Sequence, residues 1–364
     1  MAQESLLDKA RKIINEVDGE MRELFIKRMR AAEMVAEYKK ERGLGILDAS
    51  RENEIIKRNS EKVEDEVIRE YYINFLRNNM AVSRAYQSRL IEGMRIAYSG
   101  TEGAFAHIAA ERLYPSAVKV AYPGFTDAYR AVESGECDVA VLPMENSYNG
   151  DVGQVTDLMF SGSLYVNGIY DLPVSQDMLG VKGAKISDIK KVYSHPQALG
   201  QCHDYISKHG FTCQEYDNTA LAARHVAELG DKTVGAIASG EAAELFGLEI
   251  LDHDINASRS NTTRFAVFSR TANQRIGHES GVHSILLFTV RNEAGALAKA
   301  IDVIGSYGFN MRSLKSRPMK ELLWQYYFYV EAEGNIQTEN GATMMEALGE
   351  YCDKLKFVGT YIKF

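Results

Sequence analysis

The chain has 364 residues, with 42 Lys and Arg against 50 Asp and Glu, which leaves a formal net charge of −8. This length suits two or three domains that each bury a core, and the acidic balance argues against nucleic acid as a partner. Only Gly19, Gly43 and Gly45 precede residue 93, although the chain has 29 glycines. All six prolines lie at or beyond Pro115, and the first 92 residues carry 18 basic and 18 acidic side chains. We therefore expect a separate domain that ends near residue 92.

The amino-terminal residues contain no apolar segment behind their positive charges, and the longest apolar runs are too short to span a bilayer. We predict a cytoplasmic protein. The cysteines form no CxxC pair and no ligand-like spacing with histidine, so neither a disulfide framework nor a zinc site is expected. No metal and no other cofactor is predicted.

The first 92 residues predict three helices and no strand. Apolar residues recur at helical spacing from residue 4 to about residue 41, and this segment ends at Gly43 and Gly45. Asp48 or Ser50 then caps a second helix, and a third extends from about residue 64 to residue 92. The apolar positions of the first helix are Leu6, Ile13, Val17, Met21, Leu24, Ala32 and Val35.

The first helix is too long for its own domain. At 1.5 Å per residue it extends for roughly 57 Å, whereas a compact domain of about 90 residues is only about 30 Å across. Alone, such a helix would leave its apolar stripe exposed to water. Pairing with the same helix of a second copy would cover that stripe, so we expect a homodimer formed through this domain, or a tetramer built from it.

After Gly93, short β-rich runs alternate with helical ones up to residue 271. This alternation predicts an α/β domain over residues 95–271, with a mainly parallel sheet and helices on both faces. About 180 residues suit two lobes, with ligands bound in the cleft at the carboxyl ends of the strands.

The polar stretch from Thr271 to Gly281 reads as a linker, and the remaining residues, 281–364, predict the order βαββαβ. A small α+β domain of this kind is more often a ligand sensor than a catalyst, although the fold alone does not settle its role.

Two cations in the first helix share one face. Lys39 lies 11 residues after Arg28, and at 3.6 residues per turn the two differ by roughly 20° around the axis. Ala32 and Val35 lie between them on the same face, so both cations sit on an apolar stripe that we expect to face the core. Long cationic side chains can extend to water from such positions. The alternative, an anionic ligand, explains two such cations better, because unpaired buried charge is costly.

The helical domain resembles the helical class of chorismate mutases, which are intertwined dimers with long first helices. The resemblance implies that Arg28, Arg51 and Arg11 of a second copy hold the carboxylates of chorismate. Lys39 and Gln87 would donate to its ether oxygen. It also implies that Asp48 and Glu52 orient the substrate hydroxyl and that Ser83 supports a carboxylate. The residues that carry the resemblance are Arg11, Arg28, Lys39, Asp48, Arg51, Glu52, Ser83 and Gln87. Taken one at a time, these residues also have simpler explanations: Asp48 could be a helix cap, and Arg51 and Glu52 could lie on a solvated surface.

The middle domain contains GTEGAF from Gly100, PMENSYNG from Pro143, VYSHPQALGQC from Val192 and NTTRF from Asn261. Each motif alone fits an ordinary turn or strand, but together they resemble the prephenate dehydratases, whose two-lobed fold is similar to periplasmic binding proteins. The resemblance implies that Thr263 donates a hydrogen bond to the leaving hydroxyl, with Glu145 or His195 as conventional acids that could assist. It implies catalytic roles for Asn146, Gln201 and Glu145 beside Thr263, and substrate contacts by Thr101, Ser147, Ser194, His195, Thr219, Thr262 and Arg264. Ala106 stands where many relatives have serine.

The last domain resembles the ACT family, whose members bind amino acids between two copies of the domain. The family's GAL motif is matched at Gly295, Ala296 and Leu297, and its ESRP motif reads Lys315 to Pro318 here. The resemblance implies a phenylalanine site that includes Gly295, Ala296, Leu297, Asn310, Ser316 and Arg317. Lys315 stands where the family has a glutamate, so the charge at this position is reversed. The lysine either alters the phenylalanine pocket or points to solvent.

The three resemblances in this order are those of the bifunctional chorismate mutase/prephenate dehydratases of phenylalanine biosynthesis. This implies an enzyme with two activities, acting on chorismate and prephenate and regulated by phenylalanine. Two other functions stay open from the residues alone. One is a dehydratase with a non-catalytic helical dimerisation domain, and the other is a non-catalytic cytoplasmic amino-acid sensor. The preference between prephenate and arogenate is not fixed by these motifs.

Overall fold

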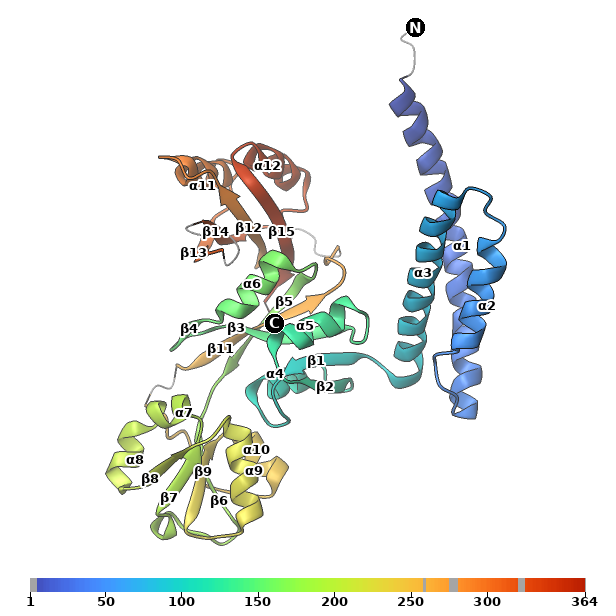
Figure 1. The fold of residues 1–364 in the computed structure, drawn as a ribbon. Helices are drawn as coiled ribbons and strands as arrows, with labels where there is room; N and C mark the ends of the chain where they lie inside the picture. Colours follow the sequence, from blue (N-terminus) through green and yellow to red (C-terminus); the bar gives the residue numbers. More distant parts are fainter. Residues whose placement is uncertain (1–4, 258–259, 275–280, 320–324, 364) are drawn as a thin grey trace. The chain divides into compact units, whose positions relative to one another are not determined.

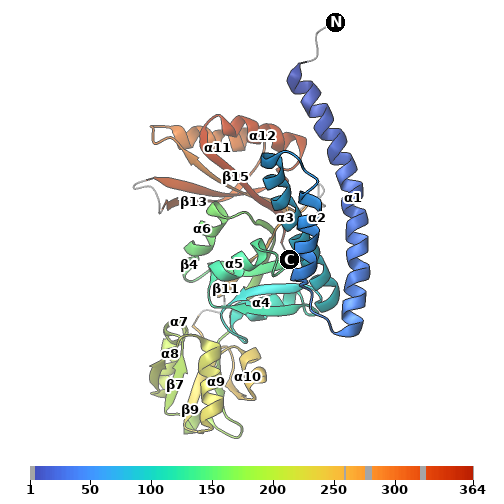
Figure 2. The same cartoon turned by 45° about the vertical axis from the view of Figure 1, so that its right-hand side comes forward.

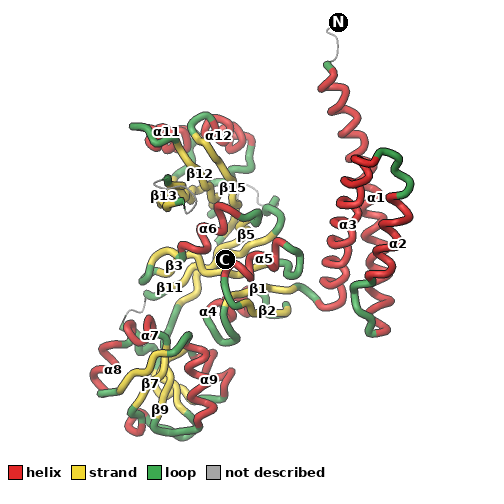
Figure 3. The backbone as a smooth tube through the Cα atoms, viewed as in Figure 1, coloured by secondary structure: helices red, strands yellow, loops and turns green. Residues whose placement is uncertain are grey.

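The computed structural model describes residues 5–257, 260–274, 281–319 and 325–363. It divides into two compact units, residues 1–95 and 96–364. Figure 3 shows only helices in the first unit and a mixture of helices and strands in the second. In the described parts of the chain, no helix is long and apolar enough to cross a membrane.

The first unit consists of three helices, as predicted. They are α1 (Leu6–Arg42), α2 (Ala49–Ser60) and α3 (Glu66–Glu92). Asp48, not Ser50, caps α2, because its side chain accepts a hydrogen bond from the backbone N–H of Arg51. Gly43 ends α1 with φ of 61°, a left-handed conformation that favours glycine.

Helix α1 leaves a row of apolar side chains uncovered. It continues beyond α2 and α3 at its amino-terminal end (Figures 1 and 2). Leu6 is 84% exposed, and Leu24 is 65% exposed. Ala32 is buried as expected, but Val35 is 43% exposed, so the predicted core-facing stripe stops short of it. Val35 lines a cavity instead of a packed core.

The first lobe of the second unit is a sheet with the strand order β2-β1-β3-β11-β5, and β4 pairs with β3. Helices α4, α5 and α6 contact this sheet. The strands are β1 (Arg95–Ser99), β2 (Val118–Tyr122), β3 (Val139–Asn146), β4 (Gly150–Asp151), β5 (Tyr165–Pro173) and β11 (Thr262–Ser269); the helices are α4 (Phe105–Leu113), α5 (Phe125–Glu133) and α6 (Gly153–Ser161).

The second lobe is a sheet with the order β10-β6-β9-β7-β8. Figure 1 shows α7 and α8 on one side of it and α9 and α10 on the other. The strands are β6 (Asp177–Gly180), β7 (Lys191–Ser194), β8 (Thr212–Glu215), β9 (Val234–Ala238) and β10 (Glu249–Asp252); the helices are α7 (Pro196–Gln201), α8 (His203–His209), α9 (Thr219–Leu229) and α10 (Gly240–Phe246), with a short 3-10 turn at Ile186–Asp188.

The prediction of a mainly parallel sheet is wrong. Strand β1 pairs parallel with β3, and β7 pairs parallel with β8 and β9. However, β11 is antiparallel to both β3 and β5, and β6 is antiparallel to β9 and β10. The chain leaves the first lobe after β5 and returns to it in β11. The connecting strands therefore run against their neighbours, which makes both sheets mixed.

The carboxyl-terminal residues have the predicted order βαββαβ. The elements are β12 (Val282–Val290), α11 (Ala296–Ser306), β13 (Met311–Pro318), β14 (Tyr326–Glu333), α12 (Glu339–Gly349) and β15 (Cys352–Ile362), with the sheet order β13-β14-β12-β15. Residues 275–280 of the predicted linker lie outside the described residues, and the division of the second unit at 271–281 stays a prediction.

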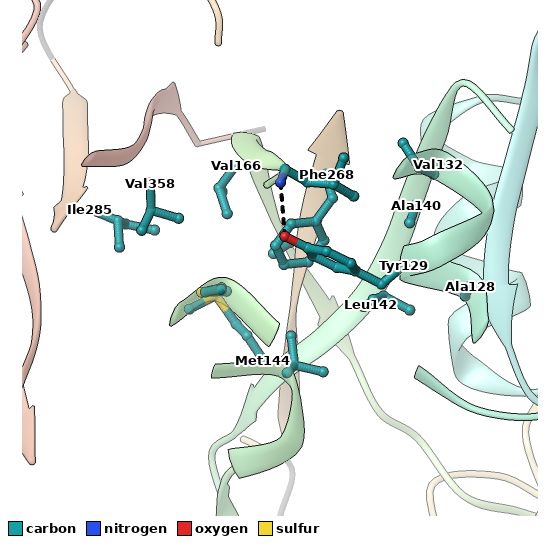
Figure 4. Close-up of a cluster of buried hydrophobic side chains, with 14 of the residues drawn as sticks. Ala128, Tyr129, Val132, Ala140, Leu142, Met144, Val166, Phe268, Ile285 and Val358 are labelled. Carbon is teal, nitrogen blue, oxygen red and sulfur yellow. Dashed lines mark hydrogen bonds between the residues drawn. The ribbon is translucent and has the colours of Figure 1, made fainter. Parts of the chain in front are cut away.

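Both faces of this carboxyl-terminal sheet are covered. Leu286 and Phe288 of β12 pack in one cluster with residues of α11 and α12. Ile285 and Leu287, on the opposite face, belong to a cluster that also contains Tyr129 and Phe268 of the first lobe. Figure 4 shows that cluster, with Ile285 and Val358 on one side and Tyr129 on the other. The carboxyl-terminal sheet and the first lobe therefore share one hydrophobic core.

The hydroxyl of Tyr129 provides a stability test of this core. It accepts a hydrogen bond from the backbone N–H of Leu164 at 2.9 Å (Figure 4), and Tyr129 is 1% exposed. We expect Tyr129→Phe to lower the free energy of unfolding by about 1–3 kcal/mol, because a buried N–H loses its acceptor. Urea unfolding followed by circular dichroism measures this. The control Tyr351→Phe, at a tyrosine that is 40% exposed, should change the value by less than about 0.5 kcal/mol; equal stabilities of the two variants would contradict the prediction.

Candidate functional site

The first unit contains a cavity of about 410 Å³ between its three helices. Most of the polar residues predicted for the helical domain line it. They are Arg28 and Lys39 from α1, Asp48 before α2, Arg51 and Glu52 from α2, and Ser83 and Gln87 from α3. Arg11 is not among the lining residues and is exposed on α1.

The two cations predicted to share a face both reach this cavity. Arg28 donates to the hydroxyl of Ser83 and to the carbonyl oxygen of Asn79 at 3.3 Å, and Lys39 donates to the carbonyl oxygen of Ile46. Burial lowers the pKa of the Arg28 guanidinium, and the charge of Glu52 opposes that shift. In the part of the chain that the structure describes, neither cation forms an ion pair. Their positive charge is therefore available to an anionic ligand.

Two further cations of the cavity are paired with carboxylates. Arg84 forms an ion pair with Glu52, which also lines the cavity, and Arg51 forms one at 2.7 Å with Glu54, which does not. Asp48 caps α2 by accepting from the N–H of Arg51 at 3.0 Å, so the cap interpretation holds whatever else Asp48 binds. Arg84 was not predicted from the sequence. Its position on α3, next to Ser83, places it at the same end of the helix as the predicted residues.

Gln87 faces this cavity with an unsatisfied polar atom. The residue is 8% exposed, and its Oε1 has no hydrogen-bond partner within the described residues. A buried polar atom without a partner is costly, and a ligand group that donates a hydrogen bond to Oε1 of Gln87 would remove that cost.

The second unit contains a cleft of about 360 Å³ that both of its lobes line. The predicted residues Asn146 and Thr263 come from the first lobe, and His195, Gln201 and Thr219 come from the second. This brings together side chains from three separate motifs of the sequence, together with Thr219, which belongs to none of them.

A chain of side-chain hydrogen bonds crosses the floor of the cleft. The amide nitrogen of Asn146 donates to the hydroxyl of Thr263 and to Oδ1 of Asn261, both at 2.9 Å. Asn261 in turn donates to Oε1 of Gln201 at 3.2 Å. Thr263 and Asn146 are direct partners in the antiparallel pairing of β11 with β3. Strand register therefore fixes this pair.

The neighbouring residues of the same strands point away from the cleft. Glu145 and Arg264 are also partners in the pairing of β3 with β11, but neither lines the cleft. Arg264 contacts Glu145 at 3.7 Å, Asp171 at 3.4 Å and Glu331 at 3.2 Å. Successive side chains of a strand face opposite sides of a sheet. Glu145, predicted as a candidate acid, and Arg264, predicted as a substrate contact, thus lie on the side of the carboxyl-terminal sheet.

Four further predicted residues support the walls of the cleft and do not line it. The hydroxyl of Ser194 is buried and donates to the carbonyl oxygen of Ile237. Thr101 accepts from Asn218 at 3.4 Å, and Asn218 caps α9 and does line the cleft. Ser147 and Thr262 join the ends of β3 and β11, because the N–H of Thr262 donates to Oγ of Ser147 at 3.0 Å.

Asn261 and Gln176, which also line the cleft, were not predicted as site residues. Asn261 precedes the two threonines of NTTRF, so the motif could have marked it as a site residue. Gln176 is 2% exposed and its Oε1 has no partner among the described side chains and backbone groups. No motif marked it.

The predicted effector residues lie at two places in the carboxyl-terminal domain. Gly295 precedes α11 with φ of 82°, and Ala296 and Leu297 begin that helix. Asn310 donates to Glu333 at 2.7 Å, and Ser316 is exposed on β13. Arg317 contacts Asp157 of α6 at 3.2 Å, so its side chain turns towards the first lobe.

Lys315 does not point to solvent. Its Nζ donates to Oε1 of Glu145 at 2.9 Å and to Oδ1 of Asp151 at 2.5 Å. Burial lowers the pKa of Lys315, but its bonds to the two carboxylates outweigh this and raise the pKa on balance.

The comparisons with known proteins agree with this architecture. The chorismate mutase type II model matches residues 10–88, and the prephenate dehydratase model matches residues 96–273. A bifunctional chorismate mutase/prephenate dehydratase from Neisseria gonorrhoeae is 31% identical, over 98% of this chain and 97% of that protein. Arogenate dehydratase 2 from Petunia hybrida is 33% identical over 74% of this chain and 71% of its own length.

Among solved structures, a prephenate dehydratase from Arthrobacter aurescens in complex with L-Phe is 25% identical to this chain. It covers 74% of this chain and 90% of its own, with a TM-score of 0.67. The resemblance stated from the motifs is thus confirmed for the mutase and dehydratase parts. The chain belongs to the bifunctional chorismate mutase/prephenate dehydratases, enzymes of phenylalanine biosynthesis.

Proposed function

We propose that the cavity of the first unit binds chorismate and rearranges it to prephenate. The reaction is pericyclic, so it needs neither a nucleophile nor a proton transfer, only a compact substrate conformer and stabilisation of charge at the breaking ether bond. Arg28 and Arg51 bind carboxylates, with Ser83 supporting one of them. Lys39 and Gln87 donate to the ether oxygen. Asp48 and Glu52 orient the hydroxyl. Arg28 and Lys39, which form no ion pair with any described residue, carry this assignment.

A second copy of the chain completes this site in our proposal. Arg11 is exposed on α1, as are Ile13 and Leu24, which are 61% and 65% exposed. Pairing of α1 with a second copy would bury these apolar side chains and could bring Arg11 to the partner's cavity. We therefore propose a homodimer formed through the helical unit, or a tetramer that contains it, in the cytoplasm.

Arg28→Ala tests the mutase site. We expect the variant to lose at least about 100-fold in mutase kcat/KM, because a charged hydrogen-bond donor to a carboxylate is removed. Dehydratase activity on added prephenate should be unchanged. Arg22→Ala is the matched control, because Arg22 lies on the same helix with a side chain that is 70% exposed. Mutase activity retained in Arg28→Ala would refute the assignment, and its total absence from the parent chain would favour a non-catalytic dimerisation domain.

We further propose that the cleft of the second unit converts prephenate to phenylpyruvate. The ring carboxylate leaves as carbon dioxide, its bonding electrons aromatise the ring, and the ring hydroxyl leaves and is protonated to water. The hydroxyl of Thr263 accepts from Asn146, and its own hydrogen has no acceptor among the described residues. It can therefore donate to the departing oxygen. Gln201 and Asn261 hold the network, and His195 is the conventional acid that lines the cleft.

Thr263→Ala tests this donor, and Thr263→Ser provides its matched control. We expect alanine to lower dehydratase kcat by about 100-fold, the scale of losing one positioned donor. Serine, which keeps the hydroxyl, should recover most of the rate. Mutase activity should be the same in both variants. A dehydratase rate in Thr263→Ala within threefold of the parent would exclude Thr263 as the donor.

The carboxyl-terminal domain is the proposed phenylalanine site, with Gly295, Ala296, Leu297, Asn310 and Ser316 as its residues. The solved relative from Arthrobacter aurescens was obtained with L-Phe, which supports an amino-acid effector here. The side chain of Arg317 is paired with Asp157. In this proposal Arg317 therefore contributes only by its position next to Ser316.

Titration calorimetry with phenylalanine tests this site. We expect binding with a Kd between micromolar and millimolar, together with a lower dehydratase rate. Binding without any change of rate would support a site that has lost regulation. No heat at millimolar phenylalanine would end the proposal, and binding without either enzyme activity would support an amino-acid sensor.

A further inference from the structure

The inner face of β13 carries two cations towards the first lobe. Exposure alternates strictly along this strand, with Lys315 and Arg317 half-buried and Leu314 and Ser316 exposed between and beside them. Lys315 and Arg317 therefore share one face. Arg317 reaches Asp157, and Lys315 reaches Glu145 and Asp151.

The two carboxylates that Lys315 contacts lie on the two strands of one hairpin. Glu145 of β3 pairs with Asp151 of β4, and Asn146 pairs with Gly150. A single ammonium group thus joins two carboxylates that face each other across the hairpin. Their side chains are 33% and 32% exposed, and that of Lys315 is 26% exposed. Without the lysine, two like charges directly opposite each other would repel.

This hairpin forms one wall of the dehydratase cleft. Asn146, Gly150 and Asp151 all line it. Asn146 donates to Thr263, and its own Oδ1 accepts from the N–H groups of Tyr148 and Asn149, at 3.0 Å each. Strand β4 has only two residues, and both are exposed. The backbone of Asn146 is held by its pairing with Thr263, whereas β4 and the turn that bonds Oδ1 of Asn146 have few contacts of their own.

We propose that Lys315 is a positioning residue of the dehydratase: it fixes β4 and the turn before it from the carboxyl-terminal sheet, and so holds the side chain of Asn146 in the orientation that donates to Thr263. Lys315 touches neither the cleft nor the substrate in this arrangement. It acts through Glu145 and Asp151. The inference rests on the proposed role of Thr263, and it gives the lysine that replaces the family's glutamate a function in catalysis.

The main test compares three variants in the full-length chain. Lys315→Met should lower dehydratase kcat about tenfold at an unchanged KM for prephenate, because misplacing a catalytic group by a fraction of an ångström has an effect of this size. Lys315→Arg should stay within about threefold of the parent. Arg312→Met is the matched control and should equal the parent. Arg312 lies on the outer face of β13 and pairs with Glu333.

The outcomes separate positioning from general stability. An equal loss in Arg312→Met would overturn the proposal, because both variants would then act by loosening the domain. A rise of KM alone in Lys315→Met would also overturn it, since the lysine would then act on substrate binding. Unchanged kcat and KM would do the same. Should Lys315→Met not fold, Lys315→Gln repeats the measurement with a neutral polar side chain.

Hydrogen exchange gives a readout that does not depend on activity. Peptides covering residues 144–152 should exchange faster in Lys315→Met than in the parent or in Arg312→Met. This measurement distinguishes a wrong role for Lys315 from a wrong role for Thr263. Faster exchange with unchanged kcat would mean that the hairpin does not control the rate and would overturn the inference, while the donor role of Thr263 is tested separately by Thr263→Ala. Unchanged exchange would remove the role of Lys315.

A double-mutant cycle with Asp151→Asn completes the test. If Lys315 acts through Asp151, the combined loss of kcat in Lys315→Met with Asp151→Asn should be smaller than the product of the two single losses. If the loss in the double variant equals the product of the two single losses, the two residues act independently and the proposed link is overturned.

Discussion

The alternation of side chains along β11 is the constraint on which the second unit depends. This strand lies between β3 and β5 in the first-lobe sheet. Thr263 faces the cleft, and Arg264, the next residue, faces the carboxyl-terminal sheet, where it meets Glu331 at 3.2 Å. Because a strand places successive residues on opposite faces, one short motif supplies both the cleft and the interface between the first lobe and the carboxyl-terminal sheet.

The interface depends on Arg264 because of the carboxylate that it meets. Glu331 is 5% exposed and accepts from the hydroxyl of Tyr361 at 2.7 Å. A buried carboxylate is tolerated only when it is paired and hydrogen-bonded. Burial lowers the pKa of Arg264, but Glu331 and the other acidic neighbours outweigh it and raise the pKa on balance. The charge of Arg264 is thereby maintained, and any change that moves β11 disturbs the cleft and this interface together.

The sequence predicted the helical unit better than the second one, for a physical reason. Helical spacing is local, so Arg28 and Lys39 could be placed on one face from their separation alone. The direction of Glu145 depends on the pairing of β3 with β11, over 100 residues later in the chain, and no local pattern contains that register. The antiparallel entry of β11 was missed for the same reason. Gln176 could not be found because its burial, with Oε1 unpartnered among the described residues, is visible only in the folded chain.

The two sites also differ in how they would hold a dianion. Among the described residues, the mutase cavity is lined by Arg28, Lys39, Arg51 and Arg84, whereas the lining of the dehydratase cleft includes no lysine or arginine. In the mutase reaction both carboxylates keep their charge, so cations bind substrate and transition state alike. In the dehydratase reaction one carboxylate loses its charge as carbon dioxide forms. A cation bound to it would stabilise the substrate more than the transition state and would slow the reaction. In the proposed dehydratase site, neutral donors such as Asn146 and Gln201 avoid that penalty.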